Sequence, residues 1–389
     1  MLPAPSQDER ARQDFAKGLR AYVQAELLPG LAPVQRKLAG AAARAGAPQA
    51  DRHAIRRGMV KEPYFQGYAL ANRTAQDLLW RSVIDSIERD LPRLNETAER
   101  LQGTLGSLTL DPLFEVPHYV TAVDIHCMPG GYTSEVGAFA AGAVYDRGVY
   151  LYAMGYVGPL NDDKGRSVCN YIKRRLPQFK PRRILDMGCT VGHSTLPYKE
   201  LFPEAEVWGI DVAAPQLRYA HLRAAGLGLE IHFAQENAEK TSFADGSFDL
   251  VVSHVLLHET SGKAMPRIFD ECHRLLAPGG YMIHADLPPF DLMDPFTQFI
   301  LDNETYYNNE PFWGAMREVD QIELAKRAGF PAETIRFDTA PMAIQEFAAT
   351  QAAGYSQDDA DAVANRTFKA GEYAPGGGWE VLIAQKAPR

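Results

Sequence analysis

The stretch Ile184-Leu-Asp-Met-Gly-Cys-Thr-Val-Gly-His-Ser194 decides the expected fold. It completes a predicted strand, 183–186, passes through a glycine-bearing turn and leads into a predicted helix, 195–201. Gly188 and Gly192 let the backbone approach a ligand closely, which a side chain would prevent. Because ligands of open parallel sheets bind at the carboxyl ends of strands, this turn is a candidate binding site.

Strands and helices alternate on both sides of this turn. Further strands are expected at 207–211, 230–234, 248–253, 281–286, 334–337 and 379–385, and further helices at 165–176, 214–225, 267–276 and 321–329. Such alternation is typical of a parallel sheet covered by helices on both faces. We therefore expect a seven-strand α/β domain over residues 161–389, preceded by a mainly helical domain over residues 1–160.

Two carboxylates flank the glycine turn. Asp186 precedes its first glycine and would repel a diphosphate, but it suits the ammonium group of an amino acid. Asp211 ends the next strand, where it can accept both hydroxyls of a ribose. An amino acid joined to a ribose without a diphosphate describes S-adenosylmethionine, whereas a dinucleotide site would favour GxGxxG without a carboxylate beside the diphosphate. The alternative for Asp211 is a purely structural role as a helix N-cap.

Residues 183–286 resemble the class I S-adenosylmethionine-dependent methyltransferases, with their Rossmann-like sheet, and in particular the ubiquinone/menaquinone C-methyltransferase-like branch. Four segments carry the resemblance in order, namely 184–192, 209–211, 235–249 and 275–280. The resemblance implies S-adenosyl-L-methionine as cofactor. It places Gly188 and Gly192 beside the methionine part, Asp211 on the ribose, and Asn237 with the backbone N–H of Ala238 on the adenine. Asp186, Cys189, Val212 and Ser253 complete the expected cofactor site.

This sequence departs from the family pattern at two positions. Thr190 stands where a middle glycine is usual, and Asn237 replaces the commoner aspartate. Both departures are compatible with the cofactor and both weaken the expected site.

Two histidines are the candidates for acid–base chemistry. His254 and His258 follow the fourth strand, where the family places the acceptor atom, and they share a face if a helix starts there. Either can instead be a structural residue that bonds local backbone. We predict no metal site, because the pair lacks a third ligand nearby.

The segment after the fifth strand interrupts the regular pattern. Residues 287–318 are rich in aromatic side chains, and we expect them to form a substrate lid with Tyr306, Tyr307 and Trp313, next to Asp286. The alternative is that these rings only pack a helix onto the core. A second insertion, 342–378, is expected to be a surface helical hairpin or an oligomer contact.

The N-terminal region is expected to cover the substrate or to form a homodimer. Its helical stretches cover residues 8–45 and 69–100, and the segment 119–125 has the pattern of a strand. His126 and Tyr145 are candidate substrate contacts, although each is more often a structural residue.

Composition limits the partners. The chain has 389 residues, a formal net charge of −9 and four cysteines without CxxC spacing. We therefore expect a cytoplasmic protein without a metal or disulfide framework. Acidic charge and the sequence Ser-His-Val-Leu after the fourth strand argue against nucleic acid as a partner, and no apolar run is long enough to span a membrane.

The function expected from the sequence is methyl transfer to oxygen, nitrogen or activated carbon of a small-molecule substrate. Three alternatives remain open at this point. They are a protein substrate, a non-catalytic binding subunit and, disfavoured by Asp186 and by strand 379–385, a nicotinamide-dependent oxidoreductase.

Overall fold

The computed structural model describes residues 3–46, 48–135, 137–345 and 378–388, and at its centre is an eight-stranded sheet. The strand order is β1-β4-β3-β2-β5-β6-β8-β7, and β8 runs antiparallel to both of its neighbours while the other pairs are parallel. The strands are β1 (Ser107–Thr109), β2 (Arg183–Met187), β3 (Glu206–Asp211), β4 (His232–Gln235), β5 (Phe248–His254), β6 (Leu276–Asp286), β7 (Arg336–Pro341) and β8 (Gly378–Gln385). The predicted α/β fold with a helical N-terminal region is confirmed.

Helices cover both faces of the sheet because side chains alternate along its strands. Ile184 of β2 packs with side chains of α7 (Asp163–Arg175), α8 (Leu196–Leu201) and α9 (Ala214–Gly226). Leu185 points to the other face, where it packs with α10 (Ala264–Leu275) and α14 (Gln321–Arg327). The order of the strands reverses between β2 and β5, so the loops after these two strands frame a crevice.

The eighth strand was not predicted. β1 comes from the chain before residue 160 and pairs in parallel with β4, from Ser107 opposite His232 to Thr109 opposite Ala234. Gly106 permits this approach, because a Cβ there would lie 2.0 Å from the Ile231 carbonyl oxygen. The N-terminal region therefore contributes an edge strand to the sheet.

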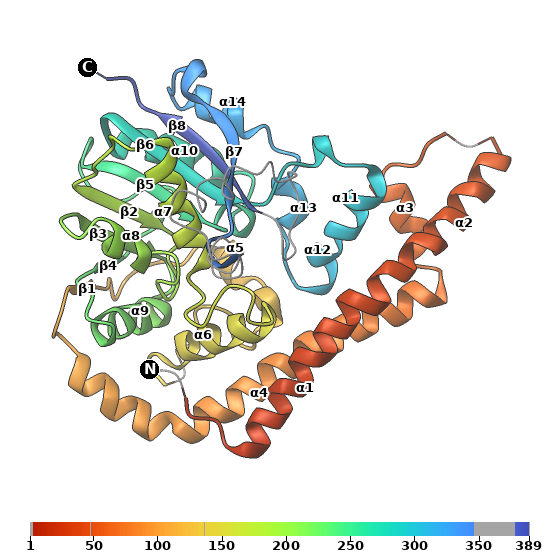
Figure 1. Ribbon diagram of the computed structural model, residues 1–389, viewed down its shortest axis with the longest axis horizontal. Helices are drawn as coiled ribbons and strands as arrows, with labels where there is room; N and C mark the ends of the chain where they lie inside the picture. Colours follow the sequence, from red (N-terminus) through yellow and green to blue (C-terminus); the bar gives the residue numbers. More distant parts are fainter. Residues whose placement is uncertain (1–2, 47, 136, 346–377, 389) are drawn as a thin grey trace, which may run out of the picture.

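Long helices form the rest of that region. They are α1 (Gln7–Tyr22), α2 (Leu31–Arg44), α3 (Arg52–Met59), α4 (Pro63–Leu101) and α6 (Ala140–Tyr152). In Figure 1, α1 lies along α4, and α6 lies between this pair and α9 of the sheet layer. The closest approach of α6 to α4 needs a glycine, because a Cβ on Gly148 would lie 2.1 Å from the buried ring of Trp80.

The predicted strand 119–125 is wrong. The structure has the short helix α5 (His118–Thr121) and then a 3-10 turn, Ile125–Cys127. The helix occupies the first half of the predicted strand, and the two residues after the segment, His126 and Cys127, have φ values of 56° and 57°, so the chain turns there. β-forming residues need a neighbouring strand, and this segment pairs with no strand among the described residues.

The segment 287–318 forms three short helices, α11 (Pro295–Leu301), α12 (Asn303–Tyr307) and α13 (Trp313–Met316). They lie between the sheet and the α2–α3 end of the N-terminal helices (Figure 1). Phe299 of α11 is buried against Phe65 of α4, with ring centroids 5.6 Å apart. Most of the second predicted insertion, 342–378, lies outside the described residues.

Two further sequence features can be compared with the structure. The four cysteines are buried free thiols. None of the helices in the described parts of the chain combines the length and the apolar character needed to cross a bilayer.

Candidate active site

A cavity opens at the carboxyl ends of β2, β3 and β5, and the N-terminal region closes its other side. One half is formed at the strand ends of the sheet, and we name it the cofactor half after the role that the sequence predicts for it. The other half is formed by the N-terminal region, the turn Leu257–Glu259 and Trp313 of α13, and we name it the acceptor half for the same reason. The residues used below that line it are Asp186, Gly188, Cys189, Asp211, Val212, Asn237, Ala238 and His254 in the cofactor half, and His126, Tyr132, Tyr145, Tyr152, His258, Glu259 and Trp313 in the acceptor half.

The glycine loop lies in the cofactor half. Gly188 and Cys189 both donate their backbone N–H groups to the Ile210 carbonyl, which ties the loop to β3. Gly188 has φ +70°, and a Cβ there would lie 2.5 Å from Leu256. Thr190 also has a positive φ, 44°, although it is not glycine. The backbone therefore adopts the tight turn that the glycines predict, at the cost of strain at Thr190.

Asp211 is the acid at the end of β3. Its two carboxylate oxygens accept hydrogen bonds from the backbone N–H groups of Thr190 and Ala213, both at 2.9 Å. Burial raises the pKa of Asp211 to about 6 despite these bonds. Each oxygen retains a lone pair, so hydroxyl groups that donate to this carboxylate would stabilise its charged form.

Asp186 and His254 form a chain of buried hydrogen bonds between β2 and β5. Asp186 accepts from the Thr195 hydroxyl at 2.6 Å and lies 3.2 Å from Nδ1 of His254. Nε2 of His254 lies 3.1 Å from the hydroxyl of Tyr198. Both ring nitrogens of His254 are thus engaged within the protein.

His258 belongs to a 3-10 turn, Leu257–Glu259, and not to a helix. The condition for His254 and His258 to share a helix face is therefore not met, because His254 is the last residue of β5 and Val255 has φ 54°. Nδ1 of His258 lies 2.6 Å from Asp286. Burial alone would lower the pKa of His258, but the charge and the hydrogen bond of Asp286 raise it. This histidine is held as part of an ion pair.

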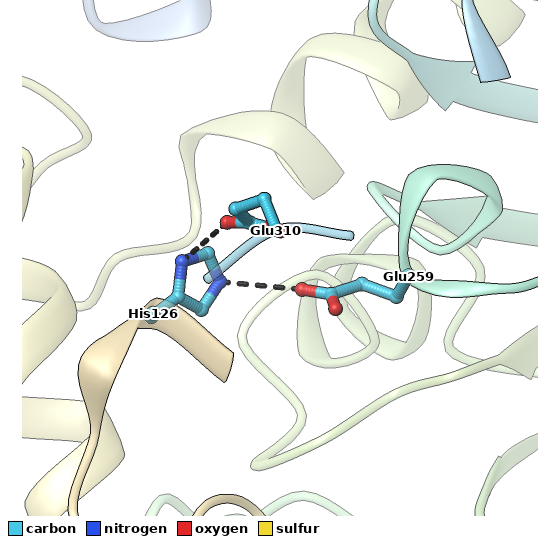
Figure 2. A group of neighbouring side chains, drawn as sticks. All are labelled: His126, Glu259 and Glu310. Carbon is cyan, nitrogen blue, oxygen red and sulfur yellow. Dashed lines mark ion pairs between the residues drawn. The ribbon is translucent and has the colours of Figure 1, made fainter. Parts of the chain in front are cut away.

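A third histidine lies in the acceptor half, between two glutamates (Figure 2). Nδ1 of His126 is 2.6 Å from Glu310, and Nε2 is 3.2 Å from Glu259. Burial alone would lower the pKa of His126, but the two carboxylates raise it to about 10. His126 is therefore an imidazolium ion at neutral pH, and we call the three residues the His126 clasp.

The backbone of His126 is held from α4. Gln76 and Trp80 both donate hydrogen bonds to its carbonyl oxygen, at 2.9 and 2.7 Å. These bonds hold His126 in a backbone conformation, φ 56°, that is unfavourable for any residue with a Cβ. The clasp is thus held by the fold on its backbone side as well as by its ion pairs.

Aromatic rings form the wall around the clasp. The ring of His126 lies 6.2 Å from Tyr132 and 5.9 Å from Tyr152, and Tyr132 lies 5.5 Å from Tyr145. The hydroxyl of Tyr132 donates to Glu259 at 3.0 Å. The acceptor half thus combines carboxylates with aromatic faces.

The structure brings twelve of the predicted site residues to this one cavity and leaves five outside its lining. The twelve are Asp186, Gly188, Cys189, Asp211, Val212, Asn237, Ala238, His254, His258, Trp313, His126 and Tyr145. The hydroxyl of Ser253 lies 2.7 Å from Nδ1 of His284, its partner on the neighbouring strand β6, and does not line the cavity. Asp286 lies behind His258, and Gly192 lies under the loop, against Leu196.

Tyr306 and Tyr307 pack toward the N-terminal helices instead of lining the cavity. Tyr306 lies under the guanidinium of Arg56, 3.2 Å from its ring centroid, and Tyr307 packs edge-on against Phe65. For these two rings, the packing alternative describes their place in the structure better than the substrate-lid prediction.

Sequence reasoning missed both glutamates of the clasp. Glu259 directly follows His258, and Glu310 lies within the aromatic segment 287–318. An acid between aromatic residues was the available signal for Glu310. No metal was predicted, yet His126, Glu259 and Glu310 offer three ligand atoms within 4.8 Å of one another.

Comparison with known proteins identifies the sheet domain. Residues 184–280 match the family model described as "Methyltransferase domain". A demethylmenaquinone methyltransferase of Thermus thermophilus is 34% identical over 137 residues, which are 35% of this chain and 60% of that protein. A malonyl-[acyl-carrier protein] O-methyltransferase of Legionella pneumophila is 29% identical over 133 residues, 34% of this chain and 46% of that protein.

Similarity to solved structures is looser. The phosphoethanolamine N-methyltransferase 2 of Haemonchus contortus, in complex with S-adenosyl-L-methionine, is 20% identical, with 63% of this chain and 57% of that chain covered and a TM-score of 0.42.

The matched segment is a class I S-adenosylmethionine-dependent methyltransferase domain, and the predicted likeness to the quinone C-methyltransferase branch is confirmed for it. The cofactor of this family is S-adenosylmethionine, and the donor set around Asp211 and the glycine loop fits it. The chain spans about half the length of the curated relatives that it matches.

Proposed function

We propose that this protein transfers a methyl group from S-adenosylmethionine to a small-molecule acceptor. The observation that carries the proposal is the continuity of one cavity from Asp211 and the glycine loop to the His126 clasp. A cofactor held at the strand ends would direct its methyl group toward the clasp, and the walls of the cavity would keep the reactants aligned and dry.

The cofactor residues have the following roles in this proposal. Asp211 accepts the ribose hydroxyls, and the open backbone at Gly188 admits the methionine part. The side-chain oxygen of Asn237 already accepts the backbone N–H of Glu239 at 2.9 Å, so one of its lone pairs and its amide N–H groups remain for the adenine. The family chemistry is an in-line displacement at the methyl carbon, which needs alignment more than acid or base catalysis.

Isothermal titration calorimetry with S-adenosylmethionine and S-adenosylhomocysteine tests the proposal. Both compounds are expected to bind, and a mass-spectrometric assay with pooled small metabolites is expected to show S-adenosylhomocysteine formed in step with a methylated product. Absence of binding by either compound contradicts the proposal. Binding without turnover on any small molecule, but with turnover on a protein extract, would reassign the acceptor to a protein.

A further inference from the structure

The acceptor half contains charged groups that the cofactor does not use. Glu259 lines the cavity, and its side chain is 15% exposed. One of its oxygens is engaged by His126 and Tyr132, while the other oxygen, Oε2, is buried with no hydrogen-bond partner among the described residues. A buried carboxylate oxygen without a partner is costly, and a ligand group that carries positive charge beside it would offset that cost.

The geometry of the clasp points to an imidazolium between two carboxylates, not to a metal centre. Glu310 and Glu259 bind opposite nitrogens of the same imidazole ring (Figure 2). A single ion binds only one of those nitrogens, so the two carboxylates would have to leave their present positions to share it. Burial raises the pKa of Glu310, whereas the hydrogen bond and charge of His126 lower the pKa of Glu259 despite its burial, so Glu259 is the more acidic carboxylate of the clasp.

Each of the four histidines that line the cavity, His126, His193, His254 and His258, contacts a carboxylate. His126 already holds its proton between two carboxylates, and His258 is ion-paired with Asp286. Both nitrogens of His254 are engaged by Asp186 and Tyr198. An alcohol acceptor would need one of these histidines, or Glu259, to take its proton as it reacts. A neutral amine has no such need, because its nitrogen carries a lone pair.

We propose that the acceptor is an amine, whose nitrogen is held by Glu259 inside the aromatic wall of Tyr132, Tyr145 and Tyr152. This inference rests on the proposed methyl transfer and names its substrate class. The nitrogen lone pair forms the new bond to the methyl carbon while the carbon–sulfur bond breaks, with its electron pair going to sulfur. The proton of the amine leaves to water before binding, and the product is a methylated ammonium ion.

The same residues stabilise the charge that develops in this reaction. Positive charge appears on the nitrogen as it is lost from sulfur, so a carboxylate and aromatic faces at the nitrogen favour the transition state more than the neutral reactant. Tyrosine rings attract ammonium ions through their electron-rich faces. Glu259 supplies the negative charge, and His126 and Tyr132 fix its position.

The test uses a matched pair of probes on the full chain in the presence of saturating S-adenosylhomocysteine. Choline carries a quaternary ammonium group, and 3,3-dimethylbutan-1-ol is its neutral isostere with the same hydroxyl. Choline is expected to raise the melting temperature by at least 2 °C, and the isostere is expected to leave it unchanged. In turnover assays, primary and secondary amines are expected to be methylated and their matched alcohols are not.

Variants separate this inference from the proposed function. E259Q is expected to weaken choline binding at least tenfold while S-adenosylhomocysteine binds as in the wild type, and the surface variant E323Q serves as the matched control. If E259Q does not fold, as judged by circular dichroism, Y145L removes one ring of the wall without changing charge and is expected to weaken choline binding at least threefold.

Several outcomes overturn the amine assignment. If both probes bind equally, or neither binds while S-adenosylhomocysteine does, the assignment fails and the proposed methyl transfer stands. If Mn²⁺ or Zn²⁺ raises the melting temperature and H126Q abolishes the effect, the clasp is a metal centre instead. If S-adenosylhomocysteine itself does not bind, the proposed function fails first.

Discussion

The two halves of the cavity are built in different ways. The cofactor half comes from the carboxyl ends of β2, β3 and β5 and from the loops after β2, β3 and β4, so its residues lie in or next to the strands that position them. The acceptor half is assembled from His126, Glu259 and Glu310, which belong to three distant segments of the chain. A local motif can encode the first arrangement, whereas the second exists only after the N-terminal helices have packed against the sheet.

The largest predicted effect is a pH-dependent contribution of His126, in the acceptor half, to the stability of the fold. The folded pKa of His126 is about 10, well above its ordinary value, so its contribution to stability is fully present below about pH 6.5 and is lost as the pH rises through 10. The stability advantage of the wild type over H126Q should shrink by several kcal/mol between pH 7 and pH 10. Urea unfolding of both proteins at these two pH values measures it, and an advantage that stays constant would contradict the imidazolium assignment.

A second prediction addresses the cofactor half. D211N removes the negative charge that accepts two backbone N–H groups and, in our proposal, the ribose hydroxyls. We expect the affinity for S-adenosylhomocysteine to fall by about 100-fold, equivalent to ~2.7 kcal/mol. Calorimetry measures it, with the exposed Asp245→Asn as control. A D211N protein that is folded and binds normally would remove Asp211 from the cofactor site.

A third prediction concerns the support of the glycine loop by α7. A Cβ on Gly165 would lie 2.3 Å from the carbonyl oxygen of Ser194, so G165A must displace the end of that loop. We expect a loss of about 1–3 kcal/mol in the free energy of unfolding, together with weaker cofactor binding. Chemical denaturation and calorimetry measure the two effects, and a fully stable variant with unchanged binding would show that the loop tolerates this displacement.

The smallest predicted effect is an increase in stability. It comes from the variant G18A, which also serves as the control for G165A. Gly18 lies within α1, and a Cβ there meets no atom within 4 Å. G18A should therefore stabilise the protein by about 0.5–1 kcal/mol through helix propensity alone. The same denaturation experiment measures it. Destabilisation by G18A would indicate a contact of α1 that the described chain does not contain.

The contrast also explains what the sequence could predict. Asp186, Gly188 and Asp211 were identified because the order of strand, glycine turn and acid is local. Glu310 was not predicted as a site residue, because its role depends on contact with His126, 184 residues earlier in the chain. Tyr306 was assigned to the cavity from composition alone, yet its ring packs under Arg56. The strand β1 was not predicted, because its three residues form a strand only through pairing with β4.

The hydrogen bonds from Gln76 and Trp80 to the carbonyl of His126 have one further consequence. They make the position of the imidazole a property of α4, a helix of 39 residues that runs far beyond the cavity. Under the proposed function, we expect substitutions along that helix to change which compounds are accepted, although the helix need not contact them. A search for new acceptor preferences should therefore mutate α4 as well as the pocket.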